Sequence, residues 1–206
     1  MTRRLPHAAV FLTLGLTACG TTAPTRYLTL APSPAATPHQ AAAGLILRPP
    51  EVRWPAAYDR LEVTRPTDGV AVTVEEFSRW SAPPAQLAVA ALTADLTARL
   101  PGGAIAPWTE AAPADAVAVS VQVETLSAEP AGYGLVAQVT IARGGLPPQR
   151  WRFQAEADGA HDAEGEAWAL SRLLGALSDR IAEHLIPGLT FQPAASAPSA
   201  SPRPAP

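Results

Sequence analysis

Residues 117–124 have the sequence VAVSVQVE, in which every second position is a valine and the positions between are small or polar. An alternation of period two indicates a β-strand with one buried face and one exposed face. The pattern returns in residues 135–141 and 151–155, and the pair Gly144-Gly145 between these two segments favours a turn. The three segments predict the strands of an antiparallel meander.

Two amphipathic helices are expected, one before and one after the meander. The first begins at Pro83-Pro84, with Ser81 as a candidate N-cap, and ends at Leu100. The second covers residues 163–185, with Asp162 as a candidate cap. Each has an apolar stripe at three- and four-residue spacing, formed by Ala85, Val89, Leu92, Leu96 and Leu100 in the first helix and by Leu170, Leu173, Leu174, Leu177 and Ile181 in the second.

Shorter strands are expected upstream. Residues 26–30 and 45–52 are candidates, and Pro49 and Pro50 would confine the latter to a sheet edge or a bulge. Residues 60–65 and 70–75 alternate around Asp68-Gly69, which favours a half-buried hairpin; Leu61 and Val63 fall on one face, as do Val70, Val72 and Val74. The predicted fold is therefore α+β: a single domain in which two amphipathic helices pack on a mostly antiparallel sheet.

The first helix also contains Asp95 and Arg99, four residues apart and away from its apolar stripe. Such a pair on a helix surface is usually solvated. We expect a solvent-exposed ion pair there and no functional site.

The amino terminus has the features of a secretory signal. Arg3 and Arg4 precede an apolar stretch over residues 8–16 that is too short to span a bilayer. It ends in LTAC, residues 16–19, and Cys19 is the single cysteine of the chain. This tetrapeptide resembles the lipobox of bacterial lipoproteins, which implies lipidation of Cys19 after removal of residues 1–18. Several acyl chains would hold the protein stably on a membrane. The alternative is a soluble exported protein cut by an ordinary signal peptidase.

The resulting organisation is a signal peptide over residues 1–18, a tether over 19–25, one domain over 26–191 and a tail over 192–206. Residues 31–43 and the tail are rich in proline and alanine and are expected to be unstructured spacers. Loss of the signal would change the formal charge from −3 to −5, so no basic footprint for nucleic acid is expected. A lipidated Cys19 leaves no thiol for disulfides or catalysis.

Signals for catalysis and for metal binding are weak. His161-Asp162 could be a base with its orienting carboxylate, but adjacent side chains rarely face each other, and Asp162 suits a helix cap better. No nucleophile elbow, zinc helix or phosphate loop occurs in the sequence. We therefore expect no enzyme, no cofactor and no metal site.

Three segments together resemble a known family. YLTL at residues 27–30, YDR at 58–60 and EFSRW at 76–80 are similar in order and spacing to the ABC-type transport auxiliary lipoproteins, the PqiC-like family. The resemblance covers roughly residues 19–190. It implies a periplasm-facing lipoprotein that binds an MCE-domain protein of an intermembrane lipid transport system, with assembly into a homo-oligomeric ring as a further expectation. Gly20, in place of the aspartate that marks retention at the inner membrane in enteric lipoproteins, favours the outer membrane.

Candidate partner-binding residues follow from these segments: Tyr58, Asp59, Arg60, Arg79 and Trp80. Tryptophan and arginine are common at interface hot spots, but Trp80 would equally serve as core, and Arg79 could pair with Glu75 or Glu76. For Asp59 an internal network with Arg60 or a capping role is favoured. The edge strand near Pro49, Pro50 and Pro55 could either accept another chain or prevent such pairing.

Two functional hypotheses stay open at this point. The first is a non-catalytic adaptor, which requires a solid core and an exposed interaction surface. The second is a lipid-binding carrier, which requires a continuous apolar cavity. We favour the adaptor.

Overall fold

The computed structural model describes residues 23–34, 42–67 and 71–186. The signal peptide, Cys19, the tail and the Asp68-Gly69 turn lie outside the described residues, so the expectations for them stay predictions. Within the described ranges, no helix is both long enough and apolar enough to span a membrane.

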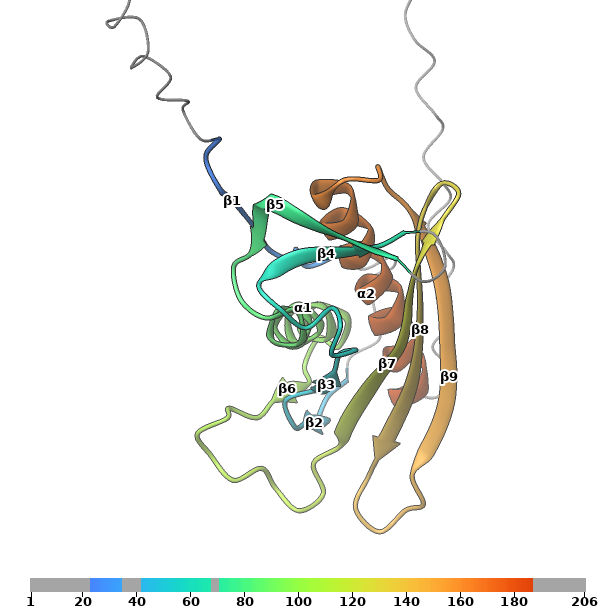
Figure 1. The fold of residues 1–206 in the computed structure, drawn as a ribbon. Helices are drawn as coiled ribbons and strands as arrows, with labels where there is room; N and C mark the ends of the chain where they lie inside the picture. The colour runs from blue at the N-terminus through green and yellow to red at the C-terminus, as the bar shows by residue number, and fades with distance from the viewer. Residues whose placement is uncertain (1–22, 35–41, 68–70, 187–206) are drawn as a thin grey trace, which may run out of the picture.

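A four-stranded sheet forms the largest part of the fold (Figure 1). Its strands are β3 (Glu51–Arg53), β7 (Ala118–Glu129), β8 (Gly132–Ala142) and β9 (Gln149–Asp158), in the order β3-β7-β8-β9. The antiparallel meander β7-β8-β9 confirms the prediction, although its strands are longer than the alternating segments suggested. Gly145 has a positive φ of 76° in the turn before β9, a conformation that favours glycine.

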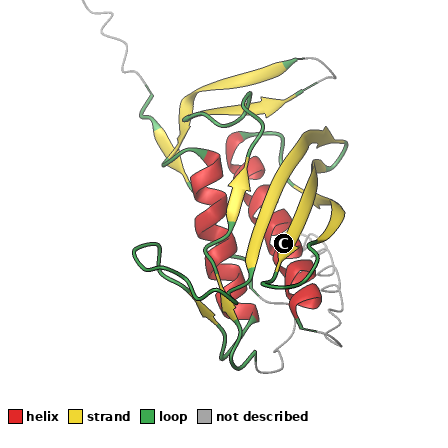
Figure 2. Cartoon of the chain, turned by 90° about the horizontal axis from the view of Figure 1, so that it is seen from below, coloured by secondary structure: helices red, strands yellow, loops and turns green. Residues whose placement is uncertain are grey.

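The two helices lie against each other and against one face of this sheet (Figures 1 and 2). They are α1 (Pro84–Arg99) and α2 (Ala163–Leu185). The valine face of β7 and the leucine stripe of α2 meet in the core, whose fully buried members include Val119, Val121, Leu135, Leu173, Leu174, Leu177 and Ile181. Asp162 caps α2 as predicted, because its Oδ1 accepts from the Gly165 N–H at 2.7 Å.

The remaining strands form two small sheets. One has the order β1-β5-β4, with β1 (Arg26–Leu28), β5 (Val72–Trp80) and β4 (Glu62–Pro66), and the other pairs β2 (Ile46–Leu47) with β6 (Ala104–Ile105). The predicted strand over 45–52 is thus divided at its prolines into β2 and β3; β3 lies at a sheet edge as expected, whereas β2 also bonds to Val117 on the side away from β6. The α+β class is confirmed, but the sheets are mixed, because β1-β5, β2-β6 and β3-β7 are parallel pairs.

The β4-β5 hairpin differs from the prediction in its buried face. Of the residues on the predicted apolar faces, Leu61, Val72 and Val74 are exposed and Val63 is buried, and Thr64 is buried as well. The register of the pair shifts between Glu62 and Thr64, so β5 contains extra residues at that point. Such an irregularity bends the strand and changes which side chains face the body of the protein.

Candidate interaction site

The β1-β5-β4 sheet, which we call the motif sheet, contains parts of two of the family-like segments, and the third, YDR at residues 58–60, lies just before β4. Tyr27 lies opposite Arg79, and Leu28 lies opposite Trp80, in the parallel β1-β5 pair. The Trp80 N–H donates to the carbonyl of Leu61 at 2.7 Å, directly after the YDR segment. Segments about 30 and 50 residues apart in sequence are therefore joined by main-chain hydrogen bonds in one small structure.

The inner face of the motif sheet belongs to the core. Trp80 is only 3% exposed and packs in the hydrophobic core, and Ser78 beside it is buried as well. This agrees with the core interpretation of the tryptophan. Trp80 therefore presents no surface to a partner and supports the sheet from inside.

The outer face carries aromatic and charged side chains. Tyr27 is 70% exposed and lies on the same face as Arg79, its partner across the strand pair. Phe77, two residues before Arg79 on β5, is exposed on this face too. Two exposed rings beside a guanidinium are a combination enriched in protein interfaces.

The charges of this face form a small network around Glu62. Its carboxylate accepts from Arg79 Nη1 at 2.9 Å and from Arg60 Nε at 3.0 Å, so Arg79 pairs with Glu62 and not with the neighbouring Glu75 or Glu76. A main-chain hydrogen bond within Glu62 and then the two guanidinium groups lower the pKa of Glu62 to about 2. With two arginines around one ionised carboxylate, the network has an excess of positive charge.

Tyr58 and Asp59 hold the motif sheet against α1. Asp59 Oδ1 accepts from the N–H of Ala85 in the first turn of α1 at 3.0 Å, which confirms the capping role expected for it. The prediction that Ser81 caps this helix was wrong. Pro83 occupies the N-cap position, and its side chain makes no capping hydrogen bond. Tyr58 is partly buried against the core. Of the five candidate partner-binding residues, Arg60 and Arg79 are the two whose charged groups lie on the outer face.

The pair Asp95 and Arg99 lies in the interior, contrary to the prediction of a solvated pair. Each residue is 1% exposed. Arg99 Nε donates to Asp179 Oδ1 of α2 at 2.5 Å, and Arg99 Nη1 donates to the carbonyl of Ser33 at 3.1 Å. The sequence pattern around α1 could not reveal these partners, because both come from distant parts of the chain.

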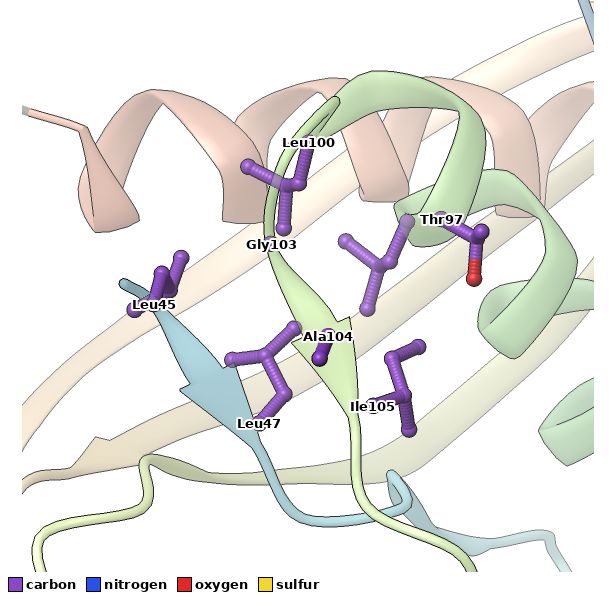
Figure 3. Close-up of a pocket in the computed structure, with 8 residues that line it drawn as sticks. Leu45, Leu47, Thr97, Leu100, Gly103, Ala104 and Ile105 are labelled. Carbon is purple, nitrogen blue, oxygen red and sulfur yellow. The ribbon is translucent and has the colours of Figure 1, made fainter. Parts of the chain in front are cut away.

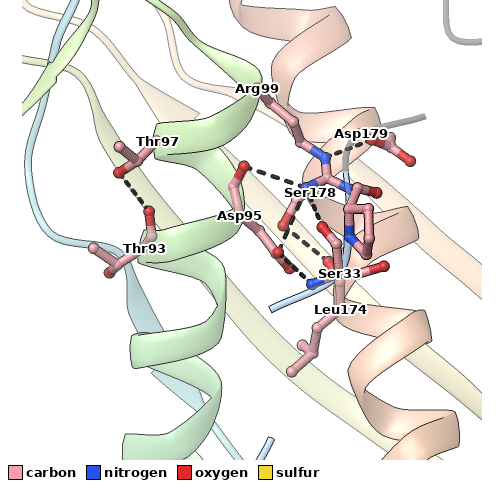
Figure 4. A network of polar contacts seen from close by, with 9 residues as sticks. Ser33, Thr93, Asp95, Thr97, Arg99, Leu174, Ser178 and Asp179 are labelled. Carbon is pink, nitrogen blue, oxygen red and sulfur yellow. Dashed lines mark hydrogen bonds and ion pairs between the residues drawn. The ribbon is translucent and has the colours of Figure 1, made fainter. Parts of the chain in front are cut away.

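These contacts fasten residues 31–34, which we call the strap, to both helices (Figure 4). The Ser33 N–H donates to Asp95 Oδ1 at 2.7 Å, and Ala31 N–H donates to Ser171 Oγ at 3.0 Å. A Cβ on Gly175 would lie 2.4 Å from that of Ser33, so only glycine leaves room for the strap. Burial raises the pKa of Asp95, partly offset by Ser33 and Arg99. The strap, predicted to be an unstructured spacer with the rest of 31–43, is therefore part of the folded domain.

A second buried carboxyl lies near the motif sheet. Glu166 is 3% exposed in the first turn of α2, and burial raises its pKa to about 8, with Arg65 opposing and Glu75 adding to the shift. Arg65 itself pairs with Glu75 across the β4-β5 hairpin. Glu166 was not predicted as a buried residue, although its position four residues before Leu170 places it in line with the buried stripe of α2.

Within the described residues, no group of three His, Asp or Glu side chains is arranged so that it could bind a metal ion. His161 is exposed, and the Asp162 beside it is used as the helix cap.

The apolar pocket between α1 and the β2-β6 pair has a cavity volume of about 10 Å³ (Figure 3). It is lined by Leu45, Leu47, Leu96, Thr97, Leu100, Gly103, Ala104 and Ile105. A space of this size is close to the minimum for one water molecule and is far below that of a ligand pocket. The pocket offers no support for the carrier hypothesis.

The fold and the site together define a small α+β domain with a packed core, in which the outer face of the motif sheet carries exposed aromatic and charged side chains. The chain belongs to the family of ABC-type transport auxiliary lipoprotein components, whose model matches residues 27–182. The matched range begins at Tyr27, within β1 of the motif sheet. As a member of this family, the protein is an auxiliary component of a transport system and a lipoprotein of the periplasmic side of a membrane.

Several solved structures resemble this fold, including the following two. One, described as an uncharacterized protein, has a TM-score of 0.65 and 17% identity, with coverage of 80% of this chain and 100% of that chain. The other, protein XCC0632 from Xanthomonas campestris, of the family DUF330, has a TM-score of 0.55 and 12% identity, with coverage of 78% and 94%. No curated protein matches the sequence of this chain. At these identities the likeness concerns the fold alone.

Proposed function

We propose that the protein is a non-catalytic adaptor lipoprotein of an MCE-type, ABC-linked intermembrane lipid transport system, anchored through Cys19 to the outer membrane. It binds an MCE-domain protein through the outer face of the motif sheet. The observation that carries the proposal is that two family-like segments contribute strands to that sheet and the third, YDR, lies just before β4, with Tyr27 and Phe77 exposed and Arg79 partly exposed on its outer face.

The position of the motif sheet along the chain supports this assignment. Six residues lie between Cys19 and Arg26 at the start of β1, so the Cα atoms of these two residues are seven steps apart along the chain. A fully extended chain of this length spans about 25 Å. A lipid on Cys19 therefore keeps the outer face close to the bilayer, where the end of a periplasm-spanning partner would meet it.

The test is co-purification with the MCE-domain partner from membranes. Phe77→Ala and Arg79→Ala should each reduce the recovered partner by about tenfold or more, as truncation of interface hot spots does. Trp108→Ala is the matched control, because Trp108 is a highly exposed aromatic residue on the loop between β6 and β7, away from the motif sheet. Circular dichroism of each variant verifies the fold. Undiminished recovery with both variants of the motif sheet would contradict the proposed interface.

A further inference from the structure

Strand β9 forms a long edge of the four-stranded sheet, and no other strand of the described residues lies beside its outer side (Figure 1). It pairs with β8 from Gln149 to Asp158 without a register shift, and it contains neither proline nor glycine. The opposite edge, β3, has three residues and is preceded by Pro50. Long, regular edges of this kind pair with strands of other chains unless something protects them.

The hydrogen-bonding phase of β9 shows which residues offer their main chain to the open edge. The Gly159 N–H donates to the Ala131 carbonyl at 3.0 Å, one position beyond the register pair Gly132 and Asp158. In an antiparallel ladder, bonded and non-bonded pairs alternate. The odd-numbered residues of β9 therefore exchange hydrogen bonds with β8, and residues 150, 152, 154, 156 and 158 direct their N–H and C=O groups outward.

The side chains of these five residues form a self-complementary series, because two arginines precede a central glutamine and two acidic residues follow it. The series is Arg150, Arg152, Gln154, Glu156 and Asp158, and all five are exposed. An antiparallel strand of the same sequence, centred on Gln154, places each arginine opposite an acidic residue.

The other face of the strand is complementary as well. In the same arrangement Trp151 lies opposite Ala157 of the second strand, and Phe153 lies opposite Ala155. A large side chain thus meets a small one at each of these positions, as in well-packed strand pairs.

We infer that two copies of this chain pair through β9, antiparallel and centred on Gln154, so that their sheets join across a two-fold axis. Roughly ten main-chain hydrogen bonds would form between the two strands. Centring the pair on Phe153 or Ala155 leaves half of the opposite-charge pairs, and centring it on Arg152 or Glu156 puts like charges on the axis. The charge series therefore selects both the partner and the register. This pairing is independent of the proposed transport role and would stand if that role failed.

A single cysteine at the centre of the strand tests the pairing. In the two-fold arrangement residue 154 faces itself, with Cα atoms about 5.5 Å apart, a distance that a disulfide bridges. The full-length Gln154→Cys chain is examined in its membrane and, in parallel, in a Cys19→Ala background. Without reductant it should run mostly at twice the monomer mass. Gln122→Cys is the matched control: it lies on the exposed face of β7, between β3 and β8, and should stay monomeric. Absence of the cross-link in Gln154→Cys, or equal cross-linking of both variants, would overturn the inference.

Charge reversal tests the register. Arg152→Glu and Glu156→Arg each place like charges opposite each other, so each variant alone should show the monomer mass in light scattering. Mixed together, the two variants should form a heterodimer, because both contacts between residues 152 and 156 are then of opposite charge. Arg152 also donates to Glu124 within its own chain at 3.3 Å. A second chain cannot restore that bond, so dimerisation of the mixture depends on the contacts between the two chains. Failure of the mixture to dimerise would therefore count against the pairing.

The experiment also tests an alternative occupant of this edge, the chain's own residues 187–206. If Gln154→Cys cross-links only after these residues are deleted, the edge is held by the tail, and the pairing of two copies is wrong for the full chain.

Discussion

Replacement of Arg99 by methionine removes the guanidinium from the network that holds the strap while keeping much of the side chain's volume. In the native protein this group donates to Asp179 and to the carbonyls of Ser33, Pro34 and Asp95. The Asp95 side chain beside it is completely buried. After the substitution, the carboxylate of Asp95 has lost the opposite charge 3.5 Å away.

The cost of this change is large for a domain of this size. Removal of one partner from a buried ion pair destabilises a protein by about 3–5 kcal/mol, because the other charge stays buried without compensation. The whole free energy of unfolding of such a domain is about 5–15 kcal/mol. With a urea m-value of about 2 kcal/mol/M, the unfolding midpoint should fall by about 2 M.

Urea unfolding followed by tryptophan fluorescence, in a Cys19→Ala background, measures the effect. Arg180→Met is the matched control, since Arg180 forms an exposed ion pair with Glu183 and its loss should cost less than about 1 kcal/mol. Amide exchange at Ser33, whose N–H donates to Asp95, should accelerate in Arg99→Met and not in Arg180→Met. Adding Asp95→Asn to Arg99→Met should recover part of the loss, because it removes the unpaired charge. Equal, small losses for Arg99→Met and Arg180→Met would refute the reasoning.

Four further changes test other parts of the structure. Glu166→Gln should flatten the pH dependence of stability. The pKa of Glu166 is about 8 in the folded protein and 4.5 in the unfolded chain, so the free energy of unfolding of the wild type falls by up to a few kcal/mol as the pH rises from 4.5 to 8. Urea titrations at several pH values measure this loss. Gly175→Ala should displace the strap, raising Ser33 amide exchange and lowering the thermal midpoint, because its Cβ has no room. Asp59→Ala should cost about 1 kcal/mol in urea unfolding by removing the α1 cap, with Arg60→Ala as the smaller-effect control. Cys19→Ala should move the protein from the membrane fraction to the soluble fraction, as fractionation and immunoblotting would show.

Local patterns predicted the parts of the fold whose partners are near in sequence. The meander strands and α2, including its cap at Asp162, were predictable because alternation, helical spacing and turn residues act within a few positions. The parallel pairs β1-β5, β2-β6 and β3-β7 were not, because short strands contain little periodicity and their partners lie many residues away. For the same reason the sequence indicated that Val72 and Val74 lie on one face of the hairpin, but not whether another element covers that face.

For the polar residues, prediction from the sequence depended even more on knowing which distant residues surround them. A capping role was one of the roles expected for Asp59, but its partner N–H, that of Ala85, lies 26 residues away, so the sequence could not identify the helix that it caps. Arg99 could not be assigned to the interior, since its burial depends on Asp179 in α2 and on the strap carbonyls. The spacing of an Asp and an Arg on a helix predicts that they can interact and leaves open whether water or protein surrounds them.

The two proposed interfaces lie on different sides of the molecule and can therefore be occupied together. β1 and β9 are on opposite sides of the fold in Figure 1, and Figure 2 likewise separates the motif sheet from the β7-β8-β9 sheet. The strap follows β1 directly and is fastened to α1 and α2, which in turn cover the sheet that ends in β9. If Cys19 carries the proposed membrane anchor, both surfaces are linked to the membrane through this one folded domain. Two copies joined through β9 would then present two motif sheets to the same membrane, and Gln154→Cys cross-linking should leave co-purification of the MCE-domain protein undiminished.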